Sequence, residues 1–348
     1  MRSFRIAVVG GGISGASAAR QLSERGHDVT LFEQHPQGHD LGSSHGRSRI
    51  VRRAYPDRFY TECMAEAYPM WRELEGASCE QLLHEVGLFY FGSKDSEQVQ
   101  SVAQGLRELD VPHEILEGDT VETQFPQIHL EPNEMGIFTP EAGWVRADVA
   151  VSSTLMLAQE AGCGIVTKRV TAADLLSYER VVVCAGPWIR DWWPDAPVTT
   201  TLQTYGYIEG GVGGPVWIAD AEDRSGFALY GFPSEPARHS FKLGVHGPGP
   251  AIDADRDGRT PHEQALSDIL EFAGRRFGIS DPKLVESKGC VYTSTENEDF
   301  LLRMLDERTF MASACSGHGF KFGPWIGKLL ADLIEERVDL GCYTRFLG

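Results

Sequence analysis

The sequence predicts an α/β protein, α+β over its whole length, in which segments of a parallel sheet near both ends enclose a more antiparallel middle. Two observations lead to this prediction. Residues 5–33 alternate strand, glycine-rich turn, helix and strand, and residues 180–186 repeat the pattern of a buried strand followed by small residues. Elsewhere helical and strand-like patterns are mixed, without an internal repeat or a long linker. This order fits one discontinuous domain with a second domain inserted into it.

The first strand and turn carry the strongest motif. RIAVV is a short apolar run typical of a buried parallel strand. GGGISG follows and places Gly10, Gly12 and Gly15 in the GxGxxG register, which allows a tight turn, close approach to a pyrophosphate and close packing of a helix over residues 16–25. Glu33 ends the next strand, where it suits an adenosine ribose and disfavours a 2′-phosphate. The segment therefore predicts a Rossmann-type site for FAD or NAD.

Small residues at two other places suit contact with a cofactor. Ala185 and Gly186 follow the strand-like run RVVVC and would let a cofactor lie against the backbone; a plain strand-to-helix turn is the alternative. Gly317 and Gly319 crowd the loop before a C-terminal helix that should begin near Pro324. Such a loop lets a helix N-terminus approach a flat, negatively charged group; a glycine-rich cap without a ligand is the alternative.

Periodicity predicts further elements between these segments. We expect helices over 58–75, 96–108, 147–160 and 262–277, and strands over 86–91, 205–209, 227–230 and 240–245.

Composition limits the partners. The 348 residues carry a formal net charge of -18, so we expect no nucleic-acid or membrane partner. Seven cysteines without metal-ligand spacing read as reduced thiols of a cytoplasmic protein, with no metal site. No apolar run is long enough for a membrane helix or a signal peptide. Basic residues nevertheless cluster at 47–53, which favours a local site for one small anion; a solvated basic loop is the alternative.

Four segments make a known family recognisable. GSSHGRSRIVRRAY (42–55), the pair YGFPS and KLGVH (230–246), GCVYTSTENEDF (289–300) and SGHGFKF (316–322) occur in that order. The chain resembles the monomeric sarcosine oxidase and N-methyltryptophan oxidase family of D-amino-acid-oxidase-like flavoproteins over nearly its whole length. The resemblance implies a Rossmann-type FAD-binding domain over 1–82, 142–197 and 297–348. It also implies an inserted, largely antiparallel β substrate domain over 83–141 and 198–296.

The resemblance also implies roles for individual residues. FAD is expected to be bound covalently through Cys290, and Lys242 to activate oxygen. The substrate carboxylate is expected at Arg52 and Lys321. The resemblance places six residues around the reacting groups: His45, Arg49, Tyr230, Lys242, His246 and Tyr292. It places three residues at the substrate: Arg52, His318 and Lys321. With the glycine motif, it places at the cofactor Gly10, Gly12, Ile13, Ser14, Gly15, Glu33, Ser44, Arg49, Val170, Ala185, Gly186, Trp188, Cys290, Gly317, Gly319, Phe320 and Lys321.

The activity so implied is oxidation of the C–N bond of a small secondary amino acid, N-methyl or cyclic, by O2, with an imine and hydrogen peroxide as products. We expect a monomer. Ser44 stands where the family often has histidine, and the loop after YGFPS is unusual, so sarcosine itself is in doubt. The stretch 170–181 is too short for the usual β-meander.

Three alternatives remain open. The chain could be a dehydrogenase that passes electrons to a quinone or carrier. It could be a biosynthetic oxidase of a cyclic imino acid, which the altered loop at 235–240 would suit. It could also be a dinucleotide-binding sensor without catalysis.

Overall fold

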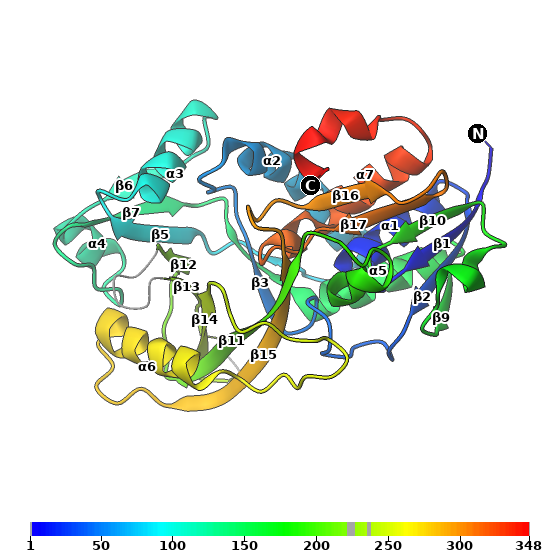
Figure 1. The fold of residues 1–348 in the computed structure, drawn as a ribbon. Helices are drawn as coiled ribbons and strands as arrows, with labels where there is room; N and C mark the ends of the chain where they lie inside the picture. Colours follow the sequence, from blue (N-terminus) through cyan, green and yellow to red (C-terminus); the bar gives the residue numbers. More distant parts are fainter. Residues whose placement is uncertain (1, 221–226, 235–237, 348) are drawn as a thin grey trace.

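The computed structural model describes residues 2–220, 227–234 and 238–347. Figure 1 shows two large sheets beside one another, with β1 and β2 at one end of the molecule and β5, β6 and β7 at the other. Residues 235–237 of the unusual loop, which the sequence linked to a cyclic substrate, lie outside the described residues.

The first sheet has the expected parallel core. Its order is β16-β17-β10-β1-β2-β9, and β16 alone among these described strands pairs antiparallel, at one edge. The strand that precedes the glycine motif therefore lies in the interior of the sheet, with its carboxyl end beside those of two neighbours. The strands are β1 (Arg5–Val9), β2 (Asp28–Glu33), β9 (Gly164–Thr167), β10 (Arg180–Val183), β16 (Leu301–Met304) and β17 (Thr309–Ser313).

Helix α1 (Ile13–Glu24) packs against α5 (Ala147–Glu160) and α7 (Gly323–Ile334). Two glycines of α7 bring it close to α1, because a Cβ on Gly323 would lie 2.3 Å from Ile13 Cγ1 and one on Gly327 would lie 2.4 Å from Ser17 Cβ. Helix α1 begins earlier than predicted, since Gly12 takes an extended conformation and acts as its N-cap. Helix α2 (Arg58–Ser78) also packs on α7.

The second sheet is largely antiparallel, as expected. Its order is β15-β11-β14-β13-β12-β5-β7-β6, and within the described residues β12 and β5 form its one parallel pair. A small sheet, β3-β8-β4, completes the fold. The strands are β3 (Ser48–Val51), β4 (Leu83–His84), β5 (Leu88–Ser93), β6 (Glu114–Leu116), β7 (Glu134–Thr139), β8 (Gly143–Arg146), β11 (Thr199–Glu209), β12 (Val216–Ala219), β13 (Ala228–Phe232), β14 (Ser240–His246) and β15 (Leu284–Ser294).

Side chains alternate between two different environments across this sheet. On β14, Phe241 and Leu243 join an apolar cluster with Phe272 of helix α6 (Glu263–Phe277). Lys242 and Gly244 occupy the opposite face, because successive side chains of a strand point to opposite sides. Helices α3 (Glu97–Glu108) and α4 (Asp119–Gln124) lie at the end of the molecule formed by β5, β6 and β7 (Figure 1).

Several predicted bounds were wrong for local reasons. The run 86–91 forms β5 two residues later, because Gly87 has a φ of +80° and interrupts the extended chain. Strand β11 extends well before the predicted 205–209. Several strands had no predicted range: β3, β4, β6, β7, β8, β9, β12, β15, β16 and β17. A short 3₁₀ helix, η1 (Ala172–Leu175), occupies the stretch in which we expected no β-meander. The division into domains at the bounds given above stays a prediction.

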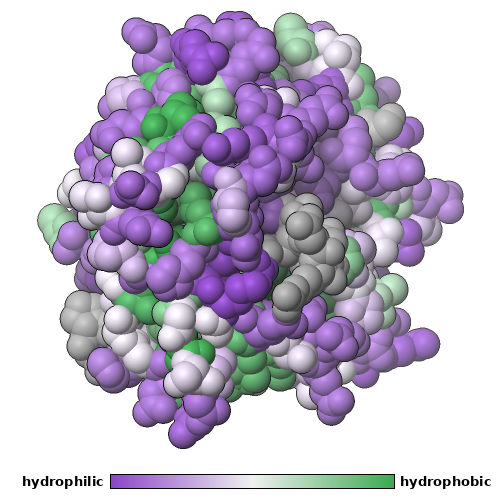
Figure 2. Space-filling view, turned by 90° about the vertical axis from the view of Figure 1, so that its left-hand side faces the viewer, coloured by the Kyte–Doolittle hydropathy of each residue, from purple (hydrophilic) through white to green (hydrophobic). Residues whose placement is uncertain are grey.

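The surface is consistent with the acidic composition. Figure 2 shows a face on which hydrophilic residues predominate and apolar residues form small separate groups. No helix in the described part of the chain is both long and apolar enough to span a membrane.

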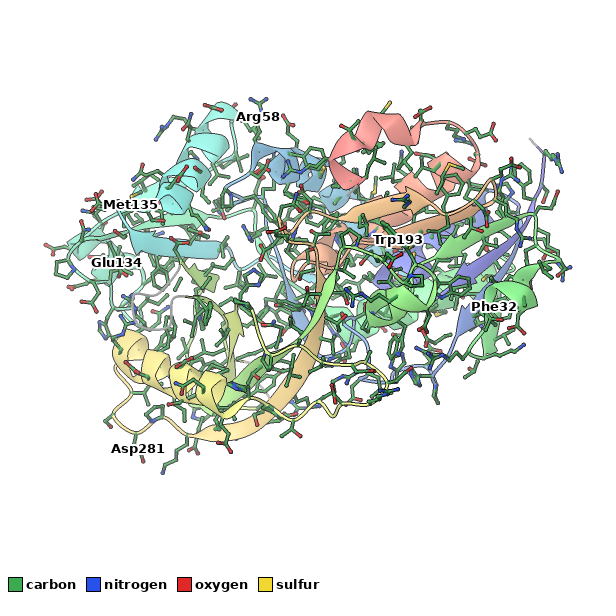
Figure 3. The ribbon with its side chains drawn as sticks, viewed as in Figure 1. Phe32, Arg58, Glu134, Met135, Trp193 and Asp281 are labelled. Atoms are coloured by element: carbon green, nitrogen blue, oxygen red, sulfur yellow. The ribbon has the colours of Figure 1, made fainter. Side chains whose placement is uncertain are left out.

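A buried ion pair joins α6 to β7. Arg276 is 2% exposed, and its two terminal nitrogens each donate to one oxygen of Glu134 at 2.6 Å. Figure 3 labels Glu134 at the end of the molecule that carries β6 and β7. Because Arg276 is buried, removal of Glu134 takes away the carboxylate that both of its terminal nitrogens contact and leaves the charge only partly compensated.

We predict that Glu134→Ala lowers the free energy of unfolding by about 3–5 kcal/mol, the usual cost of breaking a buried pair. Urea denaturation would measure this. The control is Glu62→Ala, which breaks the exposed pair between Arg58 and Glu62 on α2 and should cost at most about 0.5 kcal/mol. Equal effects of the two substitutions would contradict a structural role for the buried pair.

Candidate active site

One cavity of about 670 Å³ runs from the glycine turn after β1 to the face of β14 that carries Lys242. Its lining contains every residue that the sequence placed at the cofactor or the substrate except Gly15. A Cβ on Gly15 would lie 2.0 Å from the Gly10 carbonyl oxygen, so this glycine serves close packing of α1 rather than the cavity itself. Residues from many separate stretches of the chain thus meet in a single site.

The nucleotide end of the cavity is built from backbone. Gly10 has a φ of +98° and donates its amide to the carbonyl of Phe32, which Figure 3 labels on β2. A Cβ on Gly10 would lie 2.3 Å from the Cys184 carbonyl oxygen. At the start of α1, the amide of Ile13 donates to Ser44 Oγ at 3.1 Å. A turn without side chains in front of a helix N-terminus is suited to an anion such as a pyrophosphate.

Glu33 stands at the end of β2 as predicted. Its carboxylate accepts from the amide of Gly11 at 2.7 Å and from the amide of His35 at 3.0 Å. Burial raises the pKa of Glu33, but hydrogen bonds from His39 and these amides outweigh it and hold the pKa below its usual range. The side chain is therefore an ionised acceptor, which is the form that binds ribose hydroxyls.

Arg49 lies on β3 and binds the loop between β2 and β3 through hydrogen bonds. Its guanidinium donates to the carbonyls of Ser43 and His45 at 2.9 and 2.6 Å and lies 3.8 Å from Cys290 Sγ. Ser43 Oγ in turn donates to the Val291 carbonyl at 2.6 Å, which fixes the loop on β15. Burial and the charge of Arg49 lower the pKa of His45 to about 3, so the His45 ring is neutral at physiological pH.

A second cysteine also lines the cavity. Cys315 accepts from the amide of Thr293 at 3.5 Å, and burial raises the pKa of its thiol. It has no hydrogen bond to Arg49 among the described contacts, unlike Cys290. The two thiols therefore differ in their contact with a cation.

Lys242 lies on the cavity face of β14 and is 3% exposed. Its Nζ donates to the Ser48 carbonyl at 3.3 Å and lies 4.3 Å from the centre of the Tyr205 ring. Lys242 shares this face with Gly244, because side chains two positions apart on a strand point to the same side. A buried ammonium is thus fixed between the small sheet and the large one.

The two cations assigned to a carboxylate lie at the other end of the cavity. Arg52 packs its guanidinium 3.8 Å from the centre of the Tyr55 ring, and its buried Nη1 has no hydrogen-bond partner in the described structure. Lys321 Nζ donates to Tyr55 Oη at 2.9 Å and to the His318 carbonyl at 2.7 Å. Burial lowers the pKa of Lys321 well below its usual range, and the charges of Arg52 and Arg49 add to the shift. A bound anion would reverse this effect.

His318 is part of the same hydrogen-bond chain. Because Tyr55 Oη accepts from Lys321, its own hydrogen faces His318 Nδ1 at 3.3 Å. His318 Nε2 then donates to the Glu298 carbonyl at 3.0 Å. Burial and the charge of Lys321 hold the pKa of His318 well below its usual range, which agrees with a neutral ring in this tautomer.

The remaining predicted residues form one wall. Tyr230 lies over Gly244, where a Cβ would be 2.6 Å from the Tyr230 hydroxyl. Tyr292 and His246 pack at 5.7 Å between ring centres, and a Cβ on Gly317 would contact both. Burial raises the pKa of Tyr230 to about 12, so it stays a neutral phenol. Glycines in two of the recognised motifs therefore make room for aromatic rings.

Two residues of the site were not singled out from sequence. Tyr55 ends the recognised 42–55 segment, and a tyrosine at that position gave no separate signal. Glu298 has a φ of +61°, and its carboxylate lies 3.9 Å from His246 Nε2; this contact lowers the pKa of Glu298. It lies in a run of acidic residues that reads as a solvated loop.

The residues present fit a flavin dinucleotide. The side-chain-free turn at Gly10 and Gly12 fits a pyrophosphate, Glu33 fits a ribose, and the cavity continues past Arg49 to the sheet face. The buried Nε2 of His45 and Nη1 of Arg52, both without a described partner, point to polar groups of a ligand. Among the described residues, no group of three or more His, Cys, Asp or Glu is arranged to hold a metal ion.

Comparison with known proteins decides the family. The family model described as "FAD dependent oxidoreductase" (DAO) matches residues 5–333. The chain belongs to the DAO family of FAD-dependent oxidoreductases. This DAO-family chain is 27% identical to N-methyl-L-tryptophan oxidase of Yersinia pestis, with 98% of each chain covered.

Solved structures of the DAO fold are also similar. NikD, an unusual amino acid oxidase essential for nikkomycin biosynthesis, superposes with a TM-score of 0.84 at 24% identity, over 98% of this chain and 97% of NikD. Glycine oxidase from Geobacillus kaustophilus gives 0.81 at 19% identity, over 100% of each chain. The two-domain α/β fold inferred from the resemblance is confirmed.

Proposed function

We propose that this protein is an FAD-dependent oxidase of the C–N bond of a small secondary amino acid, N-methyl or cyclic, which forms an imine and reduces O2 to hydrogen peroxide. The observation that carries the proposal is the pair of cations at the end of a flavin-sized cavity, the half-buried Arg52 and the buried Lys321, neither of which has a described carboxylate partner. The similarity to a protein named for an N-methyl amino acid supports a secondary amine.

Bound in this cavity, a flavin would take a hydride equivalent from the substrate carbon next to the amine nitrogen. Arg52 and Lys321 would hold the carboxylate and so fix that carbon. The hydride can leave only if the amine is neutral, and the positive charge around it lowers the pKa of the amine. His45 is neutral, and no obligatory general base is assigned.

The alternatives differ in measurable ways. A dehydrogenase would reduce a quinone or carrier and form no peroxide; the buried Lys242 favours the oxidase. A cyclic imino-acid oxidase would prefer proline-like or pipecolate-like substrates in a peroxide-coupled screen. A non-catalytic sensor would not bleach when given any amine.

We predict that Cys290 carries the flavin through a thioether to its 8α-methyl group. The proposal rests on its motif and on its position beside Arg49. After acid denaturation the yellow colour should stay with the wild-type protein and with Cys315→Ser, but not with Cys290→Ser. Free flavin from the wild type would reject the covalent bond, and retention in Cys290→Ser would reject the assignment.

We predict that Arg52→Met or Lys321→Met raises KM by the equivalent of about 2–5 kcal/mol, because each removes one charged hydrogen bond to the substrate carboxylate. The control is Arg58→Met, which changes an exposed arginine of α2. Steady-state kinetics with N-methyl amino acids would measure the effect. Turnover of amines without a carboxylate as fast as of amino acids would contradict the role.

We predict that Lys242→Met is reduced by substrate at nearly the wild-type rate but reoxidises roughly 10²–10³ times more slowly. A fixed ammonium in a dry pocket stabilises the negative charge that forms on oxygen, and preorganised groups of this kind have effects of that size. Stopped-flow absorbance separates the two half-reactions. Normal reoxidation would favour the dehydrogenase alternative, and equal slowing of both would remove Lys242 from the oxygen site.

A further inference from the structure

We propose that Ile50, Tyr90, Ile218 and Phe232 form an apolar subsite, the side-chain wall, that receives an uncharged substituent of the substrate. The inference rests on the proposed function, because it assumes a substrate carboxylate at Arg52. All four residues line the cavity and belong to one apolar cluster. The side-chain wall therefore selects an amino acid that carries an apolar substituent. The size of Ile218 determines how large this substituent can be.

Strand register aligns the wall. Tyr90 of β5 pairs with Ile218 of β12, which pairs with Tyr230 of β13. Residues one position along, such as Trp217 and Phe89, belong to the cluster under α6 instead. The side chains of this row therefore share the face of the sheet that the cavity occupies.

The hydroxyl group of Tyr90 has a hydrogen-bond partner within the protein. Its hydroxyl donates to Asp220 Oδ1 at 3.1 Å, and Ser96 Oγ holds the other oxygen of this carboxylate at 2.5 Å. Tyr90 is 3% exposed and Phe232 is 4% exposed. Because the Tyr90 hydroxyl already has a partner, the ring offers the substrate carbon surface rather than a hydrogen bond.

The wall lies next to the charged groups of the site. Ile50 precedes Arg52 by two residues at the end of β3, and the charge of Arg52 acts on the Tyr90 phenol. At the other end, Lys242 Nζ lies 4.8 Å from the centre of the Phe232 ring. A substrate whose carboxylate contacts Arg52 therefore has this surface within reach of its other substituents.

Positive charge beside the wall disfavours a positively charged side chain. The cations at Arg52 and Lys242 would repel it. An apolar wall also gives no partner to a charge that loses its water. An uncharged apolar substituent is the class that remains.

The test uses acids that bind without reacting, so it does not depend on turnover. Dissociation constants of acetate, butanoate, phenylacetate and succinate are measured from the flavin absorbance of the purified, FAD-loaded protein. We expect affinity to rise about fourfold for each methylene group buried between acetate and butanoate. Succinate, which places a carboxylate against the wall, should bind more weakly than butanoate.

Ile218→Ala should shift the preference between butanoate and phenylacetate toward the larger acid by about tenfold, while acetate affinity stays unchanged. The matched control is Ile208→Ala, a fully buried isoleucine on the α6 face of the same sheet, outside the cavity lining. It should lower stability without a change in preference. If Ile218→Ala lost its flavin, Ile218→Val would carry the same test with a smaller shift.

Two results would overturn the side-chain wall: affinity independent of chain length while acetate binds, or the same shift in preference from Ile208→Ala. If no acid bound, acetate included, the carboxylate site of the proposed function would fail as well. The two failures are therefore distinguishable.

Discussion

Positive charge that is buried without a matching carboxylate is the constraint on which the site depends. The described partners of Arg49, Arg52 and Lys321 are carbonyls, a hydroxyl, a thiol and aromatic rings. Burial and the neighbouring charges of Arg52 and Arg49 hold the pKa of Lys321 well below its usual range, and neutral partners compensate such charge only in part. This local excess of positive charge lies in a chain with a net charge of -18. An anionic ligand completes the site electrostatically.

The period of two along the β-strands decides which side chains of the large sheet face the cavity. On the large sheet, one face packs on α6, which leaves the other face for Lys242, Tyr230 and the cavity. A shift of one residue in β14 would exchange Lys242 with Leu243, burying a charge under α6 and exposing an apolar side chain. The apolar pattern that folds the sheet thus also fixes where the polar groups of the site point.

The sequence predicted those features that depend on interactions between neighbouring residues. It was less informative about features that depend on contacts between distant parts of the chain. The glycine turn, the strand that carries Lys242 and helix α5 were predicted from patterns of a few residues. Strands such as β7, β8 and β12 were missed because their pairing depends on distant partners. Within the site, Glu298 could not be predicted, since its importance comes from the contact with His246, which lies 52 positions earlier in the printed sequence. The motifs of the resemblance supplied most of the site, because each keeps several cavity residues together.

The packing of α7 against α1 has a consequence for how the protein is made. The glycine turn leaves the ribosome well before Gly323 and Gly327, which hold the two helices together. Strand β17, which pairs with β10 in the interior of the same sheet, also follows it by almost three hundred residues. The dinucleotide cleft therefore cannot close before β17 and α7 have been synthesised, and cofactor capture has to wait for them.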